Sequence, residues 1–135
     1  MSKQEPRVFI RQQIYKEINP IVESFFMVAH NDSKFPYATI DVKEIDDDAY
    51  TRYSVEIEVF SKKEDTSELE KICDELKQTL NQKRVIIDGY AYVIWFDTCL
   101  TDKEDDKTIK KRVLSFEIHL FSFKWKERTI KWKQK

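Results

Sequence analysis

The stretch that decides the fold is Val85-Ile86-Ile87-Asp88-Gly89-Tyr90-Ala91-Tyr92-Val93-Ile94-Trp95-Phe96. Asp88-Gly89 separates two runs of β-branched and aromatic residues. This is the strongest short-range hairpin signal, because a type I′ turn needs positive φ at both central residues. Gly89 is also the only glycine of the chain. A P-loop, a dinucleotide-binding turn and a nucleophile elbow each need more than one glycine, so these sites are excluded and a structural or binding protein is predicted.

The composition predicts one domain, residues 1–135, with enough apolar sequence for a substantial core. Hydrophobic residues make up 41% of the chain and charged residues 36%. The net charge is −1, so we expect no general affinity for nucleic acid. The charge is unevenly distributed, however. Residues 124–135 hold six cations against Glu127 and sum to +5, so the other 123 residues must sum to −6. We treat 124–135 as a basic C-terminal extension.

The cysteine content and the chain ends predict a soluble protein of a reducing compartment. Cys73 and Cys99 are the only cysteines, too few for a disulfide scaffold. The first six residues are polar, and no apolar run approaches the length that spans a membrane.

Two helices are expected from the 3.6-residue period. The first covers 7–18, with Pro6 in its first turn and isoleucines at every fourth position. The second covers about 66–81, capped by Asp65 or Ser67, and Ser67-x-x-Glu70 has capping-box spacing. Its apolar stripe is Leu69, Ile72, Cys73, Leu76 and Leu80.

Strands are expected where apolar side chains alternate, at 37–45, 52–61 and 112–123. The run 21–29 fits a short strand or a helix equally well. The fold class is therefore α+β: a mainly antiparallel sheet of four to five strands, an N-terminal helix and one crossover helix. The inward sets are Ala38, Ile40 and Val42; Tyr53, Val55, Ile57 and Val59; and Leu114, Phe116, Ile118 and Leu120.

Two features interrupt this simple alternation. The strand 90–99 is apolar on both faces, so we expect cover on both sides, from helices or from another subunit. The pattern of 112–123 changes phase near its end, where Phe121 and Phe123 join the face of Glu117 and His119. Either a bulge shifts the register there or that face becomes covered. Acidic loops are expected at Asp46-Asp47-Asp48 and at 101–107.

No catalytic residue, metal ligand or cofactor site is predicted. His30 and His119 have no partner at a ligand spacing, and the acidic runs lack the central glycine of an EF-hand. Cys73 and Cys99 both fit buried structural thiols. The extension interleaves lysines with Trp125 and Trp132, which fits nucleic-acid binding or a guarded sheet edge, and we favour an edge or interface.

The order of these elements resembles the tail terminator (tail completion) proteins of long-tailed bacteriophages and their prophage relatives. The resemblance spans about 7–123. It rests on an N-terminal helix, an extended entry Phe35-Pro36-Tyr37-Ala38-Thr39-Ile40, the strand 53–61, a capped helix, Ile86-Ile87-Asp88-Gly89-Tyr90, and a long charged-tipped hairpin closing on Ser115-Phe116-Glu117-Ile118. The extension 124–135 lies beyond the family pattern.

The resemblance implies a structural virion protein and not an enzyme. Such proteins form hexameric rings that cap the finished tail tube, stop its polymerisation and meet the head connector. The implied partners are other copies of the chain, the tube protein and connector proteins, with DNA passing through without specific binding and no membrane. The implied locations are the host cytoplasm during assembly and the virion tail. The alternatives are another connector or stopper of the head–tail joint, and a nucleic-acid-binding module that uses the basic tail.

From the residues and the resemblance together we expect two functional surfaces. The doubly apolar strand and the aromatic chain end supply an oligomer or partner interface, and the acidic loops supply carboxylates, some of which line the channel. The interface set is Tyr92, Ile94, Phe96, Phe121, Phe123, Trp125 and Trp132. The channel set is Asp46, Asp47, Asp48, Asp102, Glu104, Asp105 and Asp106.

Overall fold

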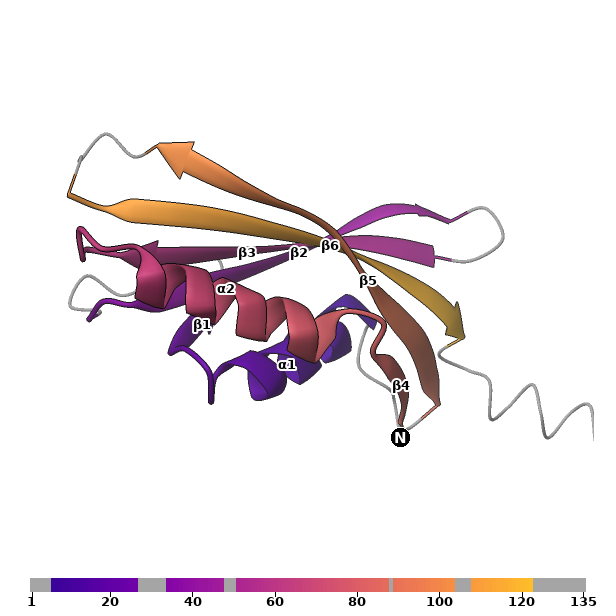
Figure 1. The fold of residues 1–135 in the computed structure, drawn as a ribbon. Coiled ribbons are helices and arrows are strands. Elements are labelled where there is room, and N and C mark those ends of the chain that lie inside the picture. The colour runs from indigo at the N-terminus through magenta and orange to yellow at the C-terminus, as the bar shows by residue number, and fades with distance from the viewer. Residues whose placement is uncertain (1–5, 27–33, 48–50, 88, 104–107, 123–135) are drawn as a thin grey trace, which may run out of the picture.

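Two helices cover one face of a twisted six-stranded sheet (Figure 1). The structure is a computed structural model that describes residues 6–26, 34–47, 51–87, 89–103 and 108–122. The strand order is β1-β2-β3-β6-β5-β4, and only β1 and β2 are parallel. The elements are α1 (Pro6–Ile18), β1 (Ser24–Phe26), β2 (Tyr37–Asp47), β3 (Thr51–Ser61), α2 (Ser67–Leu80), β4 (Arg84–Ile87), β5 (Tyr90–Lys103) and β6 (Lys110–Ser122).

The α+β class is confirmed, with six strands in place of four to five. The additional strand is β1, which comes from the run that periodicity left undecided between strand and helix. β1 follows α1 closely and pairs with β2 in parallel, Ser24 opposite Ala38. The Ala38 N–H donates to the Glu23 carbonyl at 2.8 Å, and Asn19 Oδ1 accepts from the Ser24 N–H at 3.1 Å. These bonds attach a three-residue strand that pattern alone does not reveal.

Both predicted helices form at their expected places, but the start of α2 differs in detail. Ser67 is its first residue, and Thr66 at the cap position makes no side-chain capping bond. Instead Asp65 Oδ1 accepts from the Ser67 N–H at 2.9 Å and from its hydroxyl at 2.7 Å. The Glu70 side chain binds Arg112 Nε at 2.7 Å. The capping-box prediction is therefore wrong, and Asp65 satisfies the first turn.

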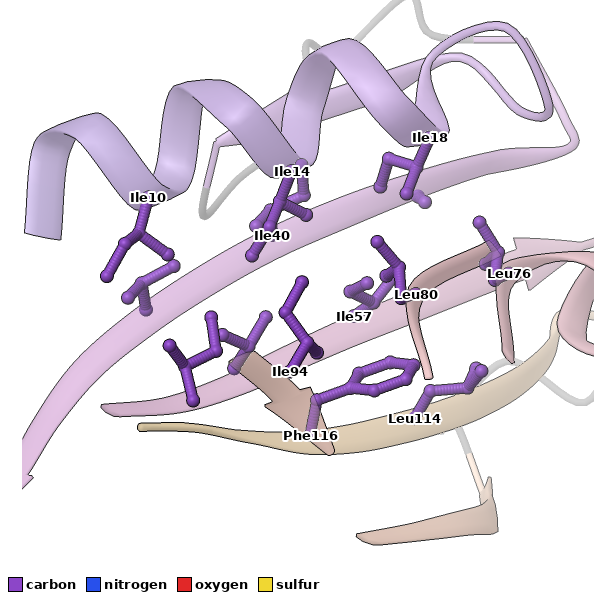
Figure 2. Packing of buried hydrophobic residues seen from close by; sticks show 14 of the residues in the cluster. Ile10, Ile14, Ile18, Ile40, Ile57, Leu76, Leu80, Ile94, Leu114 and Phe116 are labelled. Carbon is purple, nitrogen blue, oxygen red and sulfur yellow. The ribbon is translucent and has the colours of Figure 1, made fainter. Parts of the chain in front are cut away.

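The core lies between the two helices and the sheet, as Figure 2 shows. All the predicted inward residues of the helices and strands are buried in one cluster. Phe9 joins it from α1, with its ring stacked on Tyr90 at 3.8 Å between centroids. The labelled side chains of Figure 2 bring isoleucines of α1 and leucines of α2 onto the same sheet face: Ile10, Ile14, Ile18, Ile40, Ile57, Leu76, Leu80, Ile94, Leu114 and Phe116.

Two register shifts interrupt the pairing of β5 with β6. Ala91 lies opposite Ser122 while Tyr92 lies opposite Leu120, so Phe121 is the extra residue on β6. A second shift leaves Asp97 as the extra residue on β5. The first shift supports a bulge, one of the two explanations offered for the change of phase at the end of the last strand. Bulges of this kind bend the strand and increase its twist.

The predicted hairpin joins β4 and β5. Ile87 lies opposite Tyr90, so two residues connect the strands. Gly89 has φ 86°, a region that only glycine enters at little cost. Asp88 lies outside the described residues, so the turn type stays a prediction.

Replacing Gly89 with alanine is expected to destabilise the fold by about 1 kcal/mol, because a Cβ is unfavourable at this φ. Urea unfolding followed by circular dichroism measures the effect. Gln82 also has positive φ, at 62°, and Gln82→Gly serves as the matched control. It should cost nothing. Equal losses for both variants would contradict the explanation.

Candidate interaction surface

Neither of the two described helices covers the sheet face opposite to their own, and the middle of this open face carries charged side chains. Arg52 Nη1 lies 3.4 Å from Glu117 Oε1, and His119 Nε2 lies 2.7 Å from Glu117 Oε2. Lys111 Nζ lies 3.2 Å from Glu58 Oε2. The Arg52–Glu117 and Lys111–Glu58 ion pairs are partly exposed and contribute little stability. His119 is thus engaged with a carboxylate on a sheet surface.

One side of the open face carries apolar side chains along β5 and its neighbours. Trp95, 40% exposed, lies opposite Glu117, and Leu100, 59% exposed, lies opposite Val113. We call Ile86, Trp95, Leu100 and Phe121 the β5 patch. Ile86 and Phe121 are 68% and 58% exposed. Ile86 pairs with Ala91, which precedes Leu100 by nine positions on β5, so the set extends along most of the strand and is not one compact cluster.

The other side of the open face carries an aromatic cluster, Phe25, Phe35, Tyr37 and Phe60, all half-buried. The Tyr37 ring stacks on Phe60 at 4.9 Å and contacts Phe35 at 5.1 Å and Phe25 at 6.1 Å. Lys62 Nζ lies 5.0 Å from the centre of the Phe35 ring. Sequence reasoning missed this cluster. The sequence does hold a clue to it. Tyr37 and Phe60 are large aromatic residues at positions that point away from the core-facing side chains of their strands.

The predicted interface residues do not all lie on the exposed face of the sheet. Tyr92 and Ile94 are only 3% and 1% exposed, because the helices cover their face of β5. Phe96 is half-buried against Phe116. Their side chains are largely buried within a single chain, so their place at an interface stays a prediction, and Trp95 on the opposite face is an exposed side chain of the strand. Phe121 is exposed as expected. Phe123, Trp125 and Trp132 lie outside the described residues.

The expectation that β5 is covered on both faces is met on one face only. The helices cover the side of Tyr92 and Ile94. On the open side, Val93 is buried but Trp95 and Leu100 are exposed.

The two acidic segments lie at opposite ends of the sheet. β2 continues through Asp47 and β5 through Lys103, so the loop prediction is wrong for the backbones of Asp46, Asp47 and Asp102. The β2–β3 tip adjoins Thr51 opposite Leu120, whereas the β5–β6 tip adjoins Lys110 opposite Ser61. Ten residue steps along a strand separate them by about 33 Å, so they form no common site within one chain. Asp48, Glu104, Asp105 and Asp106 lie outside the described residues.

The cysteines are free and differ in their surroundings. Cys73 is buried in the α2 stripe, and burial raises the pKa of its thiol to about 12. Cys99 is exposed, which corrects the prediction of a second buried thiol, although partial burial still raises its pKa. No group of three or more possible metal ligands occurs among the described residues, and His30 lies outside them. None of the described helices is both long and apolar enough to cross a membrane.

No protein-family model matches the chain, and no curated protein matches it either. The fold is similar to that of a chain in a solved structure described as the virion of a native gene transfer agent particle. The TM-score is 0.68 at 11% sequence identity, and the match covers 87% of this chain and 98% of the other. At this identity, the likeness shows that the two chains share a fold.

Proposed function

We propose that this chain is a structural virion protein that caps a phage tail tube as a homo-hexameric ring. In this role it ends tube polymerisation and gives the head connector a surface to join. The sequence resemblance to tail terminators supports the role. So does the shared fold with a chain of a gene transfer agent virion, since the match covers nearly all of both chains.

The open sheet face is the observation that carries the proposal. It presents two different apolar surfaces, the β5 patch and the aromatic cluster, on either side of a charged band. A contact between unlike surfaces is head-to-tail, and it gives a ring when the rotation closes. Protein interfaces usually have an apolar core surrounded by polar and charged residues, and the two apolar surfaces beside the charged band are consistent with this arrangement.

The acidic hairpin tips support a passage for DNA. Because the tips lie at opposite ends of the sheet, one of them can face the channel while the other faces a neighbouring protein. Carboxylates in the channel repel phosphate, so DNA would pass without binding. The role requires no catalysis and no cofactor. The protein would act in the host cytoplasm during assembly and remain in the virion tail.

A connector or stopper ring of the head–tail joint would suit the same surfaces. Binding to tube ends separates these roles, because a terminator must recognise the tube. Electron microscopy of the protein mixed with purified tail tubes is expected to show rings at one tube end. A protein that stays monomeric and never binds tube ends would overturn the proposal.

Leu100→Ser is expected to weaken ring formation at least tenfold while leaving the melting temperature nearly unchanged. The side chain is 59% exposed in the β5 patch, so its loss removes interface area and not core. Ile45, 49% exposed on β2, provides the matched control Ile45→Ser. Sedimentation velocity over a concentration series gives both ring affinities. Equal losses for the two variants would show that the β5 patch has no special role.

Removing residues 125–135 is expected to leave the sheet folded and to weaken ring formation or tail joining. The extension 124–135 has a net charge of +5, whereas residues 1–123 have a net charge of −6. This difference favours docking of the extension on an acidic surface of a neighbouring subunit. DNA binding is the competing reading, and it predicts affinity that falls steeply with salt. Labelled DNA is titrated into the intact and shortened chains at two salt concentrations. Tight, salt-sensitive binding lost on shortening would favour the nucleic-acid-binding role.

A further inference from the structure

A pocket of about 310 Å³ lies between α1 and the β4–β5 hairpin. Its apolar walls include Ile14, Leu80 and Ile94, which Figure 2 shows converging from α1, α2 and β5. Polar and charged side chains line the rest of it: Gln13, Glu17, Lys83, Arg84 and Tyr92. The pocket therefore combines an apolar lining with several groups that can bind a polar side chain.

Tyr92 contributes a hydroxyl that has no hydrogen-bond partner among the described residues. The residue is 3% exposed, and its ring packs edge-on to Phe9 at 6.5 Å. Burial, and then the negative charge of Glu17, raise the pKa of this phenol, so it keeps its proton and can donate. A buried donor without an acceptor is unfavourable, and such groups in native structures often mark a site for something else to bind.

The charges around the pocket favour an acidic group. Lys83 Nζ lies 3.1 Å from Glu17 Oε1, and both side chains are about one-third exposed. Glu17 balances Lys83, so Arg84 leaves the pocket with a net charge of +1. Residues 1–123 of the chain sum to −6. A second copy of this chain is thus rich in the carboxylates that the pocket favours.

The position of β4 brings such a copy to the pocket. β4 ends the strand order, and no described strand pairs with its outer side. Ile87 and Tyr90 flank a two-residue turn, so they form a hydrogen-bonded pair of the antiparallel ladder. Because such pairs alternate along a strand, the backbone amide of Ile86 points away from β5, toward the free edge of the sheet. Ile86 lines the pocket and also belongs to the β5 patch. Ile86 lies opposite Ala91 and points to the open face, whereas Val85 lies opposite Tyr92 and points to the side of the pocket, so a neighbour that pairs along the free edge of β4 would contact both faces of this strand.

We infer that the pocket receives an acidic side chain of the neighbouring copy in the ring, whose carboxylate accepts a hydrogen bond from the Tyr92 hydroxyl. This inference rests on the proposed ring. It explains why a tyrosine, and not a phenylalanine, lies at a core position of β5. The aromatic ring of Tyr92 packs in the core, and its hydroxyl binds the neighbouring copy.

The test compares Tyr92→Phe with Tyr90→Phe in the full-length chain. Tyr90 is 2% exposed and stacks on Phe9, but it does not line the pocket. Tyr92→Phe should keep or raise the melting temperature, since it removes an unsatisfied hydroxyl. It should also weaken ring formation by about tenfold or more in sedimentation experiments, as expected for a lost hydrogen bond to a charged group. Tyr90→Phe should assemble as the wild type does.

The outcomes separate this inference from the proposed function. If the wild type forms rings and Tyr92→Phe forms them equally well, the inference is overturned and the ring stands. If Tyr92→Phe rings form normally but no longer bind tube ends, the pocket serves a different protein and the second-copy occupant is wrong. If the wild type forms no ring even with tube ends present, both proposals fail. A lower melting temperature for Tyr92→Phe would show that the hydroxyl is satisfied within the chain, which also contradicts the inference.

Discussion

Both helices pack on the same face of the sheet, and most other features of the molecule depend on this one-sided burial. Isoleucines at every fourth position of α1 and the leucine-rich stripe of α2 are buried against the inward side chains of β2, β3, β5 and β6. Removing this apolar surface from water is the main favourable term for folding. Within the described part of the chain, no helix packs on the opposite sheet face. It therefore remains wet in its charged centre and apolar toward both sides, an arrangement suited to partners outside the chain.

The regular part of the fold was predictable because periodicity reports burial directly. Every inward residue assigned to α1, α2, β2, β3 and β6 is buried. The failures have local physical causes. β1 has three residues, too short for a period to show. The ends of β2 and β5 carry runs of charge that resemble loops, yet backbone pairing across a hairpin continues through them. The capping-box prediction was wrong because the helix begins at Ser67 itself and Thr66 takes the cap position, while the Glu70 side chain binds Arg112.

The candidate surface was less predictable than the fold. Alternation divides the residues of β5 between two faces, but when both sets are apolar it does not say which one the helices cover. For this reason the sequence did not show that Tyr92 and Ile94 lie on the face covered by the helices and that Trp95 is exposed on the other face. The aromatic cluster depends on register between separate strands, because Tyr37 meets Phe60 only once β2 and β3 are aligned. The Tyr92 pocket is lined by residues of four elements, α1, α2, β4 and β5, and has no signature along the chain.

The sheet topology also constrains the order in which the strands can pair as the chain is synthesised and folds. The central pair, β3 with β6, joins residues roughly 50 to 70 positions apart, from Ser61 with Lys110 to Thr51 with Leu120. β6 is the last described strand to leave the ribosome, and without it β2–β3 and β4–β5 are separate hairpins. Isolated hairpins are marginal in water. The closure that unites them requires β6 to have been synthesised, and the long loop that it closes slows folding. During that interval the strand edges that β6 will occupy are open to pairing with other nascent chains.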